Sequence, residues 1–168
     1  MKTPVAKIPA KKRHTIDVTI AVTKFKDVLA SDALRGASDG RGGRGTDYIM
    51  TLPKNDPLAE IRGNDIYIKP PGAILRFTIT SARRGKTRYF PVGITYVREG
   101  DRNTSDEQRL GLLNFPQSEI YMRRQTLMIT DSYKDKTKCV RYKFSVIVQR
   151  GSDGKIGIID PGIVHEFD

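Results

Sequence analysis

The segment from position 139 to position 149 alternates apolar and polar side chains, and this pattern constrains the fold more than any other feature of the chain. The apolar residues occupy every second position: Val140, Tyr142, Phe144, Val146 and Val148. Because successive side chains of a β-strand point to opposite faces, the pattern predicts a long strand with one buried face and one face in water.

A hairpin is predicted to follow this strand. The Gly-Ser-Asp-Gly run at 151–154 favours a tight reversal, since glycine and aspartate tolerate positive φ angles. The run from Lys155 to Asp160 should then return beside the first strand. Pro161 has no backbone N–H to donate, so we expect the ladder to end at that residue.

Shorter alternating runs recur along the rest of the chain. They lie at 16–22, 48–52, 65–69, 75–79, 90–96, 119–123 and 126–130, with turn-forming residues between them. With the hairpin, this gives about eight or nine strands, and short helical turns are expected at 24–34 and 103–108. The pattern predicts an all-β fold, a two-sheet antiparallel β-sandwich formed by residues 15–168 as a single domain. Residues 1–14 are predicted to be a disordered basic N-terminal arm.

The charge of the chain indicates a class of partner. Thirty lysines and arginines stand against 19 aspartates and glutamates, a formal net charge of +11. Such an excess favours attraction to polyanions such as nucleic acid. The candidate contact residues lie in the arm, in an arginine–glycine loop and at a basic turn: Lys11, Lys12, Arg13, Arg41, Arg44, Arg83, Arg84, Lys86 and Arg88. A solvated tail and a flexible connector are the alternative interpretations of the arm and the loop.

The sequence contains no recognisable catalytic or metal-binding motif. It has no HExxH or EF-hand pattern, and His14 and His165 stand in no ligand spacing. We therefore expect a protein that is not an enzyme and needs no cofactor. The single cysteine, Cys139, excludes an internal disulfide, and no signal peptide or apolar run of membrane-spanning length is present. These features predict a cytoplasmic location.

The C-terminal hairpin resembles the end of the PixA/AidA inclusion-body protein family. The resemblance rests on a Tyr-x-Phe strand, a glycine turn and a closing Asp-Pro: Tyr142, Phe144, Val148, Arg150, Gly151, Gly154, Asp160, Pro161 and Ile163. Outside the hairpin, Tyr48-Ile49-Met50 and Leu75-Arg76-Phe77 are similar to segments of the same family. The resemblance implies a jelly-roll-like sandwich of bacterial cytoplasmic origin, without cofactor or catalysis, and carbohydrate binding as one function.

A structural or binding protein is thus predicted, and two kinds of binding site are candidates, a glycan site and a polyanion site. Because the chain has no tryptophan, a sugar would have to stack on a tyrosine, for which the candidates are Tyr89, Tyr121 and Tyr133. Salt separates the two functions, since phosphate contacts weaken steeply as salt rises and contacts to a neutral glycan do not. We also expect a homo-oligomer, most simply a dimer, because the edges of a sandwich need covering.

Overall fold

The computed structural model describes residues 14–28, 46–83, 87–98, 114–133 and 139–166. Eleven strands and one 3₁₀ helix form in these ranges. They are β1 (Thr15–Lys24), β2 (Asp47–Thr51), β3 (Ala59–Arg62), β4 (Asp65–Ile68), β5 (Ile74–Ser81), β6 (Tyr89–Arg98), β7 (Gln117–Tyr121), η2 (Met122–Arg124), β8 (Thr126–Thr130), β9 (Val140–Arg150), β10 (Ile156–Ile159) and β11 (Gly162–His165). Residues 1–13 of the predicted arm and the whole of the predicted helical turn at 103–108 lie outside the described residues.

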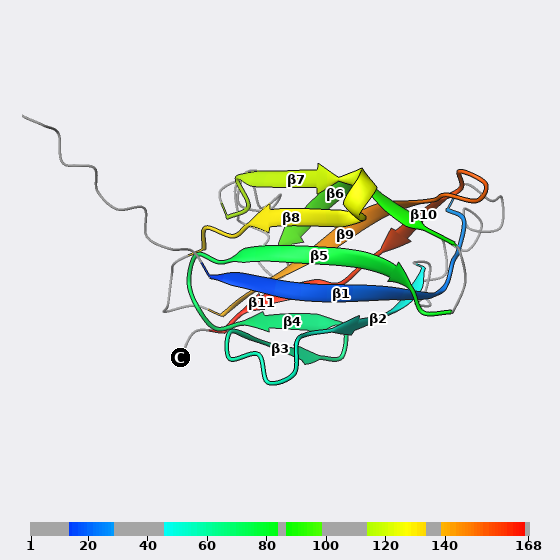
Figure 1. Cartoon of the computed structure of the whole chain (residues 1–168). Coiled ribbons are helices and arrows are strands. Elements are labelled where there is room, and N and C mark those ends of the chain that lie inside the picture. The colour runs from blue at the N-terminus through cyan, green and yellow to red at the C-terminus, as the bar shows by residue number, and fades with distance from the viewer. Residues whose placement is uncertain (1–13, 29–45, 84–86, 99–113, 134–138, 167–168) are drawn as a thin grey trace, which may run out of the picture.

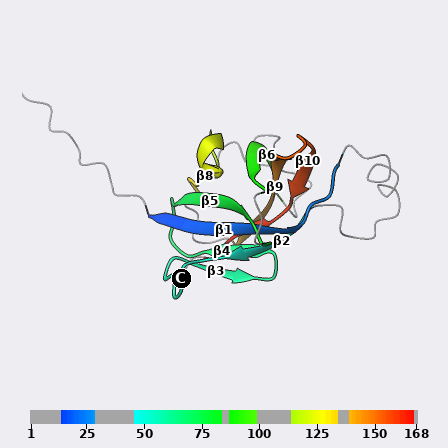
Figure 2. The same ribbon diagram turned by 45° about the vertical axis from the view of Figure 1, so that its right-hand side comes forward.

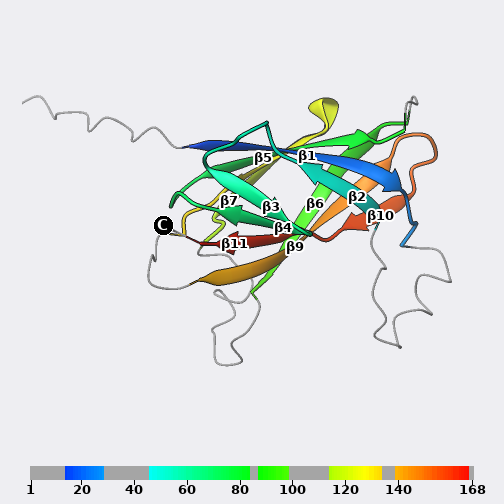
Figure 3. The same ribbon diagram turned by 90° about the horizontal axis from the view of Figure 1, so that it is seen from below.

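The strands form two sheets that pack face to face (Figure 1). Sheet A has the order β2-β1-β5-β8-β7. Sheet B is centred on β9, which pairs with β6 along one edge and with β10 and then β11 along the other, and β11 leads on to β4 and β3. Figure 3 shows β1 of sheet A above β9 and β11 of sheet B. The predicted all-β sandwich is confirmed.

The sheets are mixed, which corrects the prediction of purely antiparallel pairing. β1 pairs with β5 in parallel, from Thr15 opposite Ile74 to Val22 opposite Ser81. β11 pairs with β4 in parallel as well. Alternation of side chains sets the two faces of a strand but carries no information about the direction of its neighbour, so these pairs could not be read from the pattern.

The terminal hairpin is present, but Pro161 does not end the ladder. β10 pairs with residues 146–149 of β9, and β11 then continues along the same edge opposite residues 140–143. At the break, the Phe144 N–H donates to the Pro161 carbonyl at 3.0 Å. Proline lacks a backbone N–H but keeps its carbonyl, so the pairing with β9 is interrupted for two residues and then resumes. Asp160 is exposed at this break and Pro161 is buried.

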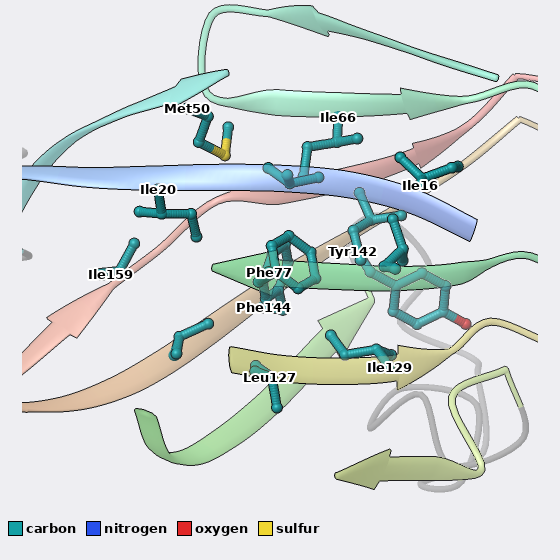
Figure 4. Close-up of a cluster of buried hydrophobic side chains, with 14 of the residues drawn as sticks. Ile16, Ile20, Met50, Ile66, Phe77, Leu127, Ile129, Tyr142, Phe144 and Ile159 are labelled. Carbon is teal, nitrogen blue, oxygen red and sulfur yellow. The ribbon is translucent and has the colours of Figure 1, made fainter. Parts of the chain in front are cut away.

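The core lies between the sheets and is built from the apolar positions of the alternating runs (Figure 4). In β1, Ile16, Val18, Ile20 and Val22 are all buried, and the residues between them are not. The ring of Phe77 on β5 meets that of Phe144 on β9 at 5.1 Å between centroids, which joins the two layers. Because the inner faces are occupied by the core, binding surfaces are left to the outer faces of the sheets, the strand ends and the turns.

Candidate anion-binding groove

A hollow lined by several cationic side chains lies around the β9–β10 turn, at one end of the sandwich. One half of it, of about 610 Å³, is lined by Val22, Thr23, Lys24, Phe25, Ser81, Arg83, Thr87, Tyr89, Arg150 and Ser152. The other half, of about 720 Å³, is lined by Arg88, Phe90, Met122, Arg123, Gln149, Arg150, Gly151 and Gly154. The two halves share Arg150, and a smaller hollow at Thr87, Arg88, Phe90, Gly151 and Ser152 adjoins both. We call the whole the basic groove.

Five cationic side chains from four segments of the chain line the basic groove. Lys24 ends β1, Arg83 follows β5, Arg88 precedes β6, Arg123 lies in η2 and Arg150 ends β9. Figure 1 shows η2, in yellow, and the β9–β10 turn, in orange, toward the same end, and Figure 2 shows β6, β9 and β10 side by side there. Positive charges gathered around a concave surface raise the local potential for anions.

Arg88 is held rigidly in the groove. Its Nε donates to the Gln125 side-chain oxygen at 3.2 Å, and its Nη2 donates to the Arg123 carbonyl at 3.0 Å. The guanidinium carbon lies 5.0 Å from the centre of the Phe90 ring, a cation–π contact. Arg88 therefore ties η2 to the start of β6, and its guanidinium is fixed over an aromatic face.

Arg150 is also fixed, by the turn that follows it. Asp153 accepts hydrogen bonds from Arg150 Nε at 2.9 Å and from Nη2 at 2.6 Å. These bonds raise the pKa of Arg150 and lower the pKa of Asp153. The guanidinium also lies 4.4 Å from the centre of the Phe25 ring, which stacks on Tyr89. Asp153 offsets part of the charge of Arg150, so Lys24, Arg83, Arg88 and Arg123 supply most of the positive potential.

Two of the nine predicted polyanion contacts, Arg83 and Arg88, lie in the described chain, and both line the basic groove. The other seven, Lys11, Lys12, Arg13, Arg41, Arg44, Arg84 and Lys86, lie outside the described residues. Sequence reasoning missed Lys24, Arg123 and Arg150. The Arg123-Arg124 pair just before a turn was a visible signal for one of them.

The three candidate sugar-stacking tyrosines are placed differently from one another. Tyr89 and Tyr133 are 7% and 8% exposed, and their rings pack against Phe25 and His165. Tyr121 is 39% exposed and lines a separate hollow of about 430 Å³ on sheet A. Of the three, Tyr121 alone therefore presents a ring to a ligand at the surface.

A buried polar pair at the opposite end was also missed. His165, which ends β11, and Asp131, which follows β8, both have fully buried side chains, and Nε2 lies 2.8 Å from Oδ2. The second carboxylate oxygen accepts a hydrogen bond from the Tyr133 backbone N–H at 2.9 Å. Three aromatic rings surround the imidazole, those of Phe115, Tyr133 and Tyr142. The two residues are 34 positions apart and belong to no sequence motif, so only the fold brings them together.

Within the described ranges, no cluster of three or more histidine, cysteine, aspartate or glutamate residues is placed to hold a metal ion. No helix in that part of the chain has the length and apolar character to span a membrane. Comparisons with family models, with curated proteins and with solved structures gave no match. The basic groove is therefore interpreted from its own chemistry.

Proposed function

We propose that the protein binds an anionic polymer in the basic groove. The proposal is carried by one observation, the convergence of Lys24, Arg83, Arg88, Arg123 and Arg150 from four segments onto adjoining hollows. A solvated face would not need arginines from distant parts of the chain to meet around concave surfaces. The net charge of +11 would also draw such a ligand toward the protein from a distance.

The groove offers both charge and hydrogen bonds to an anion. Thr23, Ser81, Thr87 and Ser152 line the same half as Lys24 and Arg83, and their hydroxyl groups can donate to phosphate or sulfate oxygens. Guanidinium groups suit such oxygens because their planar N–H donors can bind two at once.

Binding of a fluorescently labelled oligonucleotide, measured by anisotropy over a series of salt concentrations, tests the proposal. A protein that contacts phosphates should lose affinity linearly in log salt, with a slope of about 0.7 for each phosphate neutralised on a single strand. Arg83→Ala and Arg123→Ala remove exposed groove charges, and each should lower that slope by about 1 or less.

A matched control removes the same charge elsewhere. Lys54→Ala and Lys69→Ala lie in the β2–β3 connection and just after β4, and neither residue lines the groove. This pair should leave the salt slope unchanged. If the groove substitutions and the control substitutions changed the salt slope equally, binding would follow the net charge of the protein and not the groove. Absence of binding by the unaltered protein would refute the proposal.

A glycan site is a second candidate, because Tyr121 lies beside polar groups on sheet A. The hollow there is lined by Asp17, Val18, Thr19, Arg76, Thr78, Tyr121, Arg124, Thr126 and Met128. An exposed aromatic ring next to a carboxylate and hydroxyls suits a sugar, which has one apolar face and many hydroxyl groups. A glycan site agrees with the resemblance to the PixA/AidA proteins. On the same resemblance we propose that the protein is bacterial and cytoplasmic, and we propose that it forms homodimers.

Screening on a neutral glycan array tests this second candidate. Any glycan retained should bind with little dependence on salt and should be lost with Tyr121→Ser, while Arg83→Ala leaves it bound. A Tyr121→Ser protein that retains the same glycans would exclude this site.

A further inference from the structure

The two halves of the basic groove differ in chemistry. The half at Lys24 and Arg83 is lined largely by hydroxyl and cationic groups. The half at η2 is lined by an aromatic ring, a methionine and two glycines, with arginines beside them. A ligand that fills both must therefore carry an anionic part and, next to it, a flat or apolar part.

The apolar half contains a preformed planar surface. Arg88 is fixed by two hydrogen bonds, with its guanidinium carbon 5.0 Å from the centre of the Phe90 ring, so a planar cationic group is held beside an aromatic ring. Gly151 permits this arrangement, because a Cβ at that position would lie 2.8 Å from Phe90 Cε2. Bases of single-stranded nucleic acid stack on aromatic rings and on arginine planes.

Met122 also lines the apolar half. Its side chain is 46% exposed although it is a large apolar residue. The left-handed conformation of Gln125, with φ of 54°, closes η2, and the Gln125 N–H donates to the Met122 carbonyl at 2.9 Å. The backbone at Met122 is thus held in place while its thioether stays at the surface of the groove.

We propose that the anionic polymer is a single-stranded nucleic acid, with one base stacked on Arg88 against Met122 and its neighbouring phosphate bound at Lys24 and Arg83. This inference rests on the proposed function and names its ligand. In a duplex both faces of each base are covered by neighbours, so only an unpaired base can stack on the protein. A sulfated glycan would supply the charge but no planar group for the apolar half.

Four labelled ligands of matched length distinguish the outcomes: a thymidine oligonucleotide, an abasic oligonucleotide, the duplex of the first, and a sulfated oligosaccharide. The two single strands and the oligosaccharide are also matched in charge. We expect the thymidine strand to bind about fivefold or more tightly than the abasic strand, which is the contribution of one stacked base. Met122→Ser and Arg88→Lys should reduce this preference while abasic binding changes little, since neither removes charge. Ile120→Ser, at an exposed apolar residue that does not line the groove, is the control.

Equal affinity for the thymidine and abasic strands, or tighter binding of the duplex or the sulfated glycan, would overturn the base site and leave anion binding intact. Loss of binding to all four ligands would instead refute the proposed function itself. Arg88→Lys also removes hydrogen bonds to η2, so a reduced preference in Met122→Ser is the decisive result. An unchanged preference in Met122→Ser overturns the inference.

Discussion

Replacing Asp131 by alanine is expected to lower the free energy of unfolding by about 3–5 kcal/mol. The carboxylate is fully buried and makes two hydrogen bonds. One joins it to His165 Nε2 at 2.8 Å, and the other is donated by the Tyr133 backbone N–H at 2.9 Å. Alanine deprives each of these groups of a buried acceptor, which costs about 1–3 kcal/mol apiece. The sum agrees with the cost of breaking one side of a buried ionisable pair.

Urea unfolding followed by circular dichroism measures this loss as a shift of the midpoint at constant slope. The control is Asp17→Ala, which breaks a pair with Arg76 whose side chains are 44% and 48% exposed. An exposed pair contributes less than about 1 kcal/mol, so this control should change the midpoint little. Asp131→Ala and Asp17→Ala proteins of equal stability would refute the argument from burial.

A double substitution separates the pair from its surroundings. Asp131→Ala together with His165→Phe removes both polar partners and keeps an aromatic ring among Phe115, Tyr133 and Tyr142. Since replacing both partners by apolar groups costs far less than orphaning one, the double variant should lose less than the sum of the single losses, by about 1–3 kcal/mol. Strict additivity would show that the two side chains do not act as a pair.

Two further expectations follow from burial and close packing. Burial, with the Asp131 carboxylate nearby, raises the pKa of the Tyr96 phenol, so this tyrosine ionises at lower pH in the unfolded chain than in the folded protein. The free energy of unfolding should therefore keep its full value below about pH 10 and fall above it. Urea midpoints measured across that range should fall less in Tyr96→Phe. A midpoint that does not decline in alkali would contradict this. Gly157→Ala should cost about 1–3 kcal/mol in the same assay, because its Cβ would lie 2.5 Å from Thr46 Oγ1 and 2.7 Å from Phe25 Cε2, and a neutral result would show that both neighbours can move.

The sequence predicts those features of the fold that depend on local alternation. The runs at Ile16–Val22 and at Val140–Val148 become β1 and β9, with the predicted faces buried. The parallel partners and the strand β11 were not predicted, because pairing direction and the return of the chain after Pro161 depend on distant residues. Gly162–His165 is also buried at all four positions, so the segment has no alternation of apolar and polar residues to recognise.

The candidate site residues also divide into those that the local sequence identifies and those that only the fold brings together. Arg83 and Arg88 were identified because they are close in sequence, and the fold retains them in one groove. Lys24, Arg123 and Arg150 come from three other segments, so only the packed sheets bring them to the same end. His165 gave no signal, since an isolated histidine acquires its partner, Asp131, through the contact between a strand of sheet B and the chain leaving sheet A.

The two ends of β8 therefore perform different tasks. At its C-terminal end, Asp131 is sealed in an aromatic cluster with His165, where a polar group contributes through burial and contacts no solvent. At its N-terminal end, η2 presents Met122 and Arg123 to the basic groove. A strand of five residues spans about 16 Å, a separation at which substitutions usually act independently. The groove charges of Arg83 and Arg123 can thus be removed without disturbing this pair, because His165 and Asp131 lie at the other end of the strand.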